Sequence, residues 1–172
     1  MKKVYVYEVI EAYEFDIEML RADKKNTNRT KLIQRDELML QMLRTLPSDL
    51  RLDCEGTPTD SLKLNAGSLT ELIINYHLAK NPDEIKVLQK SGGLFDAKRG
   101  CIDVEIKLCV NGSCYNTPIR HKALTYLVNR DGVFMITVKE IDELAPKGKL
   151  PYKEWEGAKH IKSLEKALGF NK

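Results

Sequence analysis

A strict alternation of apolar and polar residues from Cys101 to Val110 constrains the fold more than any other part of the chain. The apolar positions are Ile102, Val104, Ile106, Leu108 and Val110, and the positions between them are Cys101, Asp103, Glu105, Lys107 and Cys109. Successive side chains of a strand point to opposite faces of the sheet. The pattern therefore predicts a half-buried β-strand with one apolar face and one charged face.

The residues before this strand predict its partner in a β-hairpin, with Arg99-Gly100 as a two-residue turn. In that register Asp96 lies opposite Asp103, with Glu105 on the diagonal. Facing carboxylates destabilise a sheet by about a few tenths of a kcal/mol, and a divalent cation would remove the repulsion because hard metal ions bind clustered oxygen atoms. Lys107 lies on the same face. A one-residue slip would move Asp96 to the apolar face and leave Asp103 to act with Glu105.

Length and composition predict a single globular domain spanning residues 1–172. Of the 172 residues, 42% are hydrophobic and 31% are charged, as in soluble proteins. No apolar run reaches the about 18 residues of a membrane span, and no secretory signal is visible near Met1. We therefore expect a cytoplasmic protein without a membrane partner. The net charge of +3 permits a polyanionic partner but does not establish one.

The four cysteines are Cys54, Cys101, Cys109 and Cys114, and no two of them form the Cys-x-x-Cys pair of a zinc site. In a reducing compartment we predict that they are free thiols.

Turn residues and hydrophobic periodicity predict the remaining elements. Before the hairpin we expect a helix or a strand-to-helix switch over 1–20, a polar loop over 23–30, a helix over 31–46, a long loop over 48–67, a helix over 68–80 and a strand over 84–88. After it we expect a helix over 117–127, a central strand over 133–138, a linker over 146–151 and an amphipathic helix over 152–168. Ser68 followed by Glu71 fits a capping box at the start of its helix.

Basic side chains gather at two places that could contact phosphates. Arg120, His121 and Lys122 crowd the first turn of a predicted helix, where cations oppose the helix dipole unless an anion is bound. The loop over 23–30 is either a basic arm or a solvated turn. The complete set of candidate nucleic-acid-binding residues is Lys24, Lys25, Arg29, Lys98, Arg99, Arg120, His121 and Lys122.

The middle of the chain resembles the common core of the PD-(D/E)xK, or restriction-endonuclease-like, nuclease superfamily. The resemblance is carried by a helix with Glu71, a strand, a strand with Asp96, a strand with Glu105-x-Lys107, a helix and a strand, from about Ser68 to Ile141. It implies an α/β (mixed α+β) fold, in which helices flank a central mixed β-sheet and a β-hairpin carries the acidic residues. The core would span about 68–141, with 1–67 as a helical and loop extension and 152–172 as a C-terminal helix.

The resemblance also implies a set of site residues. Asp96 and Glu105 would ligate Mg²⁺, with Mn²⁺ as a substitute. Lys107 would orient or deprotonate the attacking water, and Glu71 would be the auxiliary acid. The sequence departs from the family pattern because Phe95, not proline, precedes Asp96. Asp103 is an additional carboxylate that could share the metal or replace Asp96 as a ligand.

The expected function is that of a Mg²⁺-dependent DNA endonuclease, of the restriction or junction-resolving type. A homodimer is expected because each chain carries one site and a two-fold dimer can cut both strands; the helix over 31–46 is the candidate contact. Three alternatives remain open: a nucleic-acid-binding module without catalysis, a protein-interaction domain, and a strand face decorated only by cross-strand ion pairs.

Overall fold

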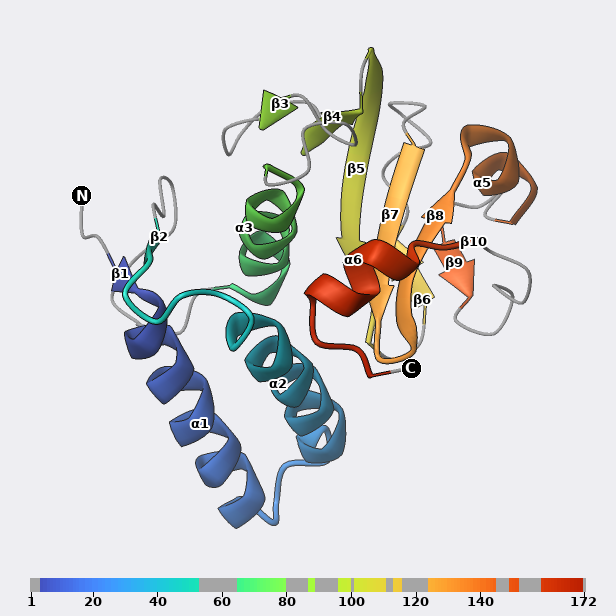
Figure 1. Ribbon diagram of the computed structural model, residues 1–172. Helices are drawn as coiled ribbons and strands as arrows, with labels where there is room; N and C mark the ends of the chain where they lie inside the picture. Colours follow the sequence, from blue (N-terminus) through green and yellow to red (C-terminus); the bar gives the residue numbers. More distant parts are fainter. Residues whose placement is uncertain are drawn as a thin grey trace. The chain divides into compact units, whose positions relative to one another are not determined.

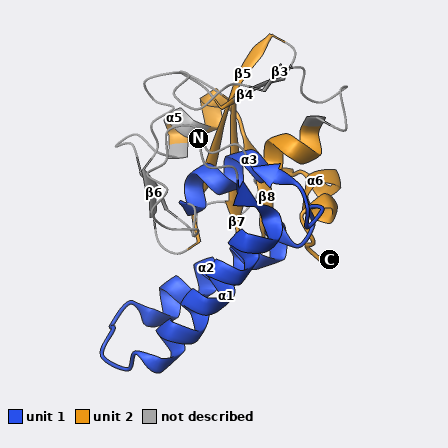
Figure 2. Cartoon of the chain, turned by 90° about the vertical axis from the view of Figure 1, so that its left-hand side faces the viewer, with its two compact units in different colours: residues 1–73 blue, residues 74–172 orange. Residues whose placement is uncertain are grey.

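The computed structural model describes residues 4–52, 65–79, 87–88, 96–99, 101–110, 113–115, 124–144, 149–151 and 159–171. They form a mixed α/β structure (Figure 1). The chain divides into two compact units, Met1–Ile73 and Ile74–Lys172, with the boundary inside a helix (Figure 2). Whether both units belong to one domain stays a prediction.

The first unit is built on a helical hairpin. Strand β1 (Val4–Tyr5) pairs antiparallel with β2 (Arg51–Leu52), and the chain passes from β1 directly into helix α1 (Val6–Ala22). The predicted strand-to-helix switch is thus confirmed. Helix α1 packs against α2 (Arg29–Leu43). The α1 residues that are buried recur at helical spacing and are Val6, Val9, Tyr13 and Ile17.

Helix α2 begins and ends earlier than the predicted range of 31–46. Its N-cap is Asn28, so Thr30 lies inside the first turn instead of capping it. The preceding loop is held by short side-chain contacts, in which Asn26 Oδ1 accepts a hydrogen bond from the backbone N–H of Asn28 at 2.9 Å. Such local bonds stabilise turns before a helix. They allow α2 to begin at Arg29, two residues before the predicted start.

Helix α3 (Ala66–Ala79) begins before the predicted capping box. Asn65 Oδ1 accepts hydrogen bonds from the backbone N–H groups of Gly67 at 2.9 Å and Ser68 at 3.3 Å. Asn65 therefore satisfies donors that a helix start leaves without intrahelical partners. The capping box of Ser68 and Glu71 is wrong, since Ser68 already lies within the first helical turn.

The described part of the second unit contains a six-stranded mixed sheet. Its order is β10-β8-β7-β5-β4-β3. The strands are β3 (Val87–Leu88), β4 (Ala97–Arg99), β5 (Ile102–Leu108), β7 (Leu124–Asn129), β8 (Gly132–Ile136) and β10 (Lys159–His160). Strands β5 and β7 are parallel, and the other neighbours are antiparallel. The predicted hairpin of β4 and β5 is confirmed.

Strand β7 corrects the helix predicted over 117–127. Residues 124–127 are extended and belong to the sheet, while 116–123 lie outside the described residues. Every residue of β7 is buried, so the strand lacks the polar alternation that would distinguish it from a buried helix. The spacing of Leu124 and Leu127, read as helical, fits a strand covered on both faces equally well.

The central strand predicted over 133–138 is confirmed as β8, although it runs from Gly132 to Ile136. It lies between β7 and β10. Its end is fixed by Thr137, which caps helix α5 (Val138–Leu144): the backbone N–H of Thr137 donates to Glu140 Oε2 at 2.7 Å, and Thr137 Oγ1 accepts from the N–H of Glu140 at 3.3 Å. This capping box was not predicted.

The C-terminal helix predicted over 152–168 is also shorter than expected. Lys159 and His160 form β10, which pairs with β8, and helix α6 covers only Lys162–Ala167. Residues 152–158 lie outside the described residues. The predicted inward positions Leu164 and Leu168 are buried. Part of the expected linker is strand β9 (Lys149–Pro151), which pairs with β6 (Ser113–Tyr115).

The cysteines differ from one another. Cys101 is a free and exposed thiol, as predicted. Cys109 is disulfide-bonded, and the partner side chain lies outside the described part of the chain. The prediction of four free thiols is therefore wrong for Cys109, because the absence of a Cys-x-x-Cys pair says nothing about cysteines brought together by the fold.

Candidate active site

The register of the hairpin differs by two residues from the predicted one. Lys98 lies opposite Asp103 and Arg99 opposite Ile102, so the predicted turn at Arg99-Gly100 is wrong. The predicted pairing of Asp96 with Asp103 is wrong. Because side chains alternate with a period of two, a shift of two residues keeps Asp96 on the same face as Glu105. The charged face of the hairpin is therefore retained.

Asp96 lies immediately before β4, where regular pairing ends. Its backbone N–H donates to the carbonyl oxygen of Val104 at 3.0 Å. Its carboxylate then accepts a hydrogen bond from the N–H of Ile106, with Oδ2 at 2.6 Å. The side chain of Asp96 thus occupies the acceptor position that a backbone carbonyl would fill in a longer strand. The partners of these two bonds, Val104 and Ile106, are the sequence neighbours of Glu105. The bonds therefore hold the Asp96 carboxylate beside β5.

Glu105 and Lys107 form a close ion pair on this strand. Glu105 is only 6% exposed, although its face was expected to be open to solvent. Lys107 Nζ lies 2.5 Å from Glu105 Oε1, and the lysine side chain is 26% exposed. Residues two apart in a strand share a face, which allows this contact. Two of the predicted site residues are therefore in contact.

The charges of this cluster act on Asp96. Burial is the largest influence and raises the pKa of Asp96 above its ordinary value; the negative charge of Glu105 raises it further. The hydrogen bond from Ile106 and the positive charge of Lys107 lower it. Perturbed acids with specific charged neighbours occur preferentially at functional sites. Asp96, Glu105 and Lys107 thus form one electrostatic cluster.

Two neighbouring oxygen atoms were not identified from the sequence. Thr125 pairs with Glu105 across the parallel strands and so lies on the same face. Asn75, on α3, donates from Nδ2 to the carbonyl oxygen of Asp96 at 3.5 Å. Thr125 Oγ1 and Asn75 Oδ1 are buried, and neither has a hydrogen-bond partner among the described residues. No motif marks either residue, because their positions depend on the pairing of distant segments.

The donor set fits a magnesium ion bound by few protein ligands. Mg²⁺ usually retains several water molecules and binds one or two carboxylates together with substrate oxygens. Asp96 and Glu105 supply two carboxylates, and Thr125 adds a neutral oxygen on the same face. No group of three His, Cys, Asp or Glu side chains suited to a metal occurs within the described residues. A site built from this cluster would thus need water and substrate to complete the coordination.

The other predicted site residues lie at the start of β5 or on other parts of the chain. Glu71 lies on α3 in the first unit, and its role stays a prediction, as does metal binding by Asp103. Lys24 and Lys25 are exposed in the loop before α2, and Arg29 opens that helix. Lys98 and Arg99 lie in β4, and their side chains are not described. Arg120, His121 and Lys122 lie outside the described residues.

The comparisons with known proteins give no match: no family model, curated protein or solved structure matches the chain. The geometry of the described residues is therefore the basis for assigning a function. In that part of the chain, no helix is both long enough and apolar enough to cross a membrane.

Proposed function

We propose that the protein is a Mg²⁺-dependent DNA endonuclease with a restriction-endonuclease-like core. The order of elements supports this fold: α3 is followed by β3, β4 and β5, and the next sheet strand, β7, lies parallel to β5. A parallel neighbour requires a crossover connection between the two strands. The helix and the three strands match the first part of the core expected over 68–141, whereas the helix expected before the last strand is replaced in part by β7.

The observation that carries the proposal is the cluster of Asp96, Glu105 and Lys107. Two carboxylates with one lysine, partly shielded from water at the end of a hairpin, cost free energy unless a cation joins them. The raised pKa of Asp96 reflects this cost. An arrangement that is unfavourable by itself and suited to Mg²⁺ is better explained by function than by stability.

The residues have distinct chemical roles in this proposal. Asp96 and Glu105 would hold Mg²⁺, and the bound ion would supply charge neutralisation at the phosphoryl oxygens and a lowered pKa of its water. Lys107, already positioned by Glu105, orients the attacking water and stabilises negative charge that develops on the phosphate in the transition state. Ile106 holds Asp96 in place through its backbone N–H. The neutral oxygen of Thr125, on the face of Glu105, would accept a hydrogen bond from water only once the site is filled.

The second candidate is a nucleic-acid-binding module that keeps this fold without catalysis. The contact between Lys107 and Glu105 favours it, because the ion pair also neutralises Glu105 without any metal. Such a module would bind DNA in a salt-sensitive way and would need no divalent cation.

Cleavage assays separate the two candidates. Linear duplex, four-way junction and single-stranded DNA are incubated with the protein and Mg²⁺, Mn²⁺ or EDTA. We expect cutting with either metal and none with EDTA. Glu105→Gln and Lys107→Ala should each reduce the rate by about a hundredfold or more. Lys139→Ala, which changes an exposed lysine on α5, is the matched control and should retain full activity.

The result that contradicts the endonuclease is undiminished cutting by both Glu105→Gln and Lys107→Ala, or metal-independent DNA binding without any cutting. The second outcome would identify the binding module. Sedimentation equilibrium on the same samples tests the proposed homodimer, which should be the species that cuts both strands of a duplex.

A further inference from the structure

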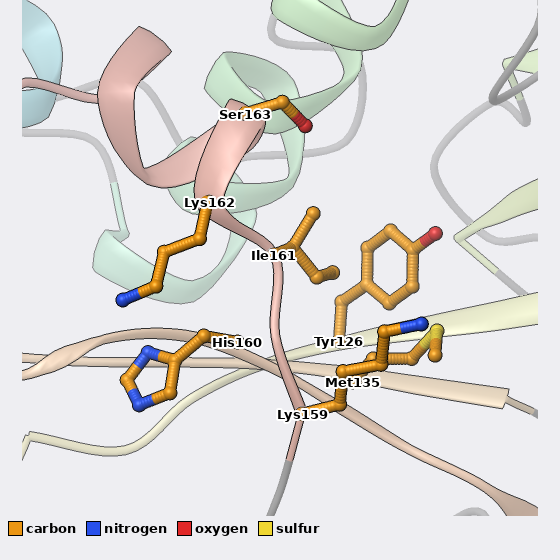
Figure 3. A pocket seen from close by; sticks show the side chains of 7 residues that line it. All are labelled: Tyr126, Met135, Lys159, His160, Ile161, Lys162 and Ser163. Atoms are coloured by element: carbon orange, nitrogen blue, oxygen red, sulfur yellow. The ribbon is translucent and has the colours of Figure 1, made fainter.

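A cavity of about 310 Å³ lies where β10 leads into α6 (Figure 3). Its lining combines two kinds of side chain. Tyr126, Met135 and Ile161 are largely apolar, whereas Lys159, His160 and Lys162 are basic or titratable. Small-molecule sites are typically concave, apolar and equipped with a few polar groups. The volume is at the lower end of the range for such sites, which suits a small ligand.

The cavity is separate from the carboxylate cluster. Tyr126 pairs with Met135, and Met135 pairs with Lys159, so these three residues form a row across one face of the sheet. Tyr126 also pairs with Ile106, which follows Glu105 in β5. Neighbouring residues of a strand point to opposite faces. The row that lines the cavity therefore lies on the face opposite Glu105.

The base of the cavity is suited to a flat apolar group. Tyr126 is almost completely buried and closes the cavity from within, while Met135 and Ile161 are partly exposed. A thioether and a branched aliphatic chain adapt to the face of a ring. A purely ionic ligand, such as inorganic phosphate, would leave this apolar surface unused.

The rim of the cavity is positively charged. Lys159 and Lys162 are exposed on either side of the junction between β10 and α6. The only acid with a described contact to a rim side chain is Glu165, which lies 3.7 Å from Lys162 and 2.8 Å from His160 Nδ1. Glu165 thus contacts one of the two rim ammonium groups, that of Lys162, and the imidazole of His160. The cations exceed the anions among these four side chains, which favours an anionic ligand.

His160 is held in a defined orientation. A carboxylate can only accept hydrogen bonds, so Nδ1 donates to Glu165 and Nε2 is directed away from it. The ring of Phe134 lies 4.2 Å from the imidazole ring, centroid to centroid. An imidazole fixed from two sides loses little conformational entropy when a ligand binds.

We infer that this cavity binds one nucleotide, with the base against Met135 and Ile161 and the phosphate against Lys159, while Lys162 adds positive charge on the other side of the rim (Figure 3). The nucleotide is either a free mononucleotide or one unit of a single strand, since both present the same chemistry. Bases bind apolar and aromatic platforms without sequence preference, and lysines recognise the phosphate as point charges. This site does not depend on hydrolysis at the carboxylate cluster.

Calorimetric titration of the full chain without divalent cations tests the site. The probes are a nucleoside 5′-monophosphate, the matching nucleoside, inorganic phosphate and a short single-stranded oligonucleotide. The double variant Lys159→Gln with Lys162→Gln should weaken mononucleotide binding about tenfold or more, because it removes the charged contact of Lys159 and the positive charge of Lys162 at the rim. Lys166→Gln is the matched control, since Lys166 is exposed on α6 outside the cavity.

Tighter binding of the mononucleotide than of the nucleoside or phosphate supports the two-part site. If the oligonucleotide binds and shows the same loss in the double variant, a strand is the source of the nucleotide. If only the mononucleotide does so, the free nucleotide is the ligand. Equal binding to the double variant and to Lys166→Gln, or binding of neither nucleotide probe at about millimolar concentration, would overturn the inference.

Discussion

Each unit of the protein contains buried acidic residues, and the two units differ in how many cations balance these acids. In the first unit Asp36 is fully buried, and Arg35 donates to its Oδ1 from Nε at 3.0 Å and from Nη2 at 2.9 Å. In the second unit Asp96 and Glu105 share the influence of Lys107, and the pKa of Asp96 is raised. One acid faces one cation in the first site, whereas two acids face one cation in the second.

We infer from this difference that Asp36 carries a structural charge, whereas Asp96 and Glu105 carry the charge of the proposed metal site. A buried ion pair with good geometry can persist inside a fold, and removing one partner is costly. The pair of Arg35 and Asp36 is of this kind. Its surroundings are also buried: burial, and then the charge of Asp36, raise the pKa of Tyr13 well above its ordinary range. Tyr13 therefore keeps its proton in the core of the helical hairpin. At Asp96 the imbalance of charge leaves a place for an added cation.

The largest expected effect tests the structural side of the comparison. Arg35→Met keeps an apolar stem of similar length but leaves Asp36 buried without its guanidinium partner. We expect the free energy of unfolding to fall by about 3 kcal/mol, at the lower end of the usual range because Arg35 is 33% exposed. Urea denaturation monitored by circular dichroism measures this change.

The matched control is Arg44→Met, at the C-terminal end of the same helix. Arg44 Nη2 lies 3.0 Å from Glu14 Oε1, but both side chains are about half exposed. Exposed pairs of this kind contribute about 0.5 kcal/mol. Similar losses in the two variants would show that burial of Asp36 is not what makes its ion pair important.

The second prediction concerns the functional side. Asp96→Asn keeps an oxygen that can accept from Ile106 but removes one of the two negative charges. We expect the free energy of unfolding to rise by about 1.5 kcal/mol, because functional sites often sacrifice stability, while Mg²⁺-dependent cleavage is lost. Thermal denaturation and the plasmid assay measure the two effects. A destabilised Asp96→Asn protein would contradict the idea that this cluster is strained without a cation.

The same variant predicts a dependence on pH. Since the pKa of Asp96 is raised from 3.8, the folded state binds this proton more tightly than the unfolded state. The advantage of Asp96→Asn over the wild type should be full above the raised pKa, and it should disappear as the pH falls towards 3.8. Denaturation curves of both proteins across this range test the sign. A constant difference would mean that ionisation of Asp96 is not its cause.

The sequence predicts the charged face of the hairpin because that face depends only on alternation. Although Lys98 pairs with Asp103 instead of Cys101, a shift of two residues keeps Asp96 on the face of Glu105. The association of Asp96 with Glu105 and Lys107 could therefore be anticipated. The hydrogen bond from Ile106 could not, because it arises where regular pairing stops.

Elements that depend on distant pairing could not be predicted in the same way. The segment at Leu124 is a strand because β5 and β8 lie on either side of it, and the segment at Lys159 is extended because it pairs with β8. In both cases tertiary pairing overrides a pattern that also fits a helix. For the same reason no sequence pattern identifies Thr125 and Asn75 as site residues, although the fold brings them beside the carboxylates.

The smallest expected effect sharpens the comparison at Thr125. Its buried hydroxyl lacks a hydrogen-bond partner among the described residues, so Thr125→Val should raise the free energy of unfolding by about 1 kcal/mol. Thr70 is equally buried, but its hydroxyl donates to the carbonyl oxygen of Ala66 at 2.7 Å. Thr70→Val should therefore lower stability by a similar amount.

If Thr125 serves water in the active site, its variant is more stable and cleaves DNA several-fold more slowly. A stabilised variant with unchanged cleavage would remove Thr125 from the site and leave the two carboxylates and Lys107 as its described components.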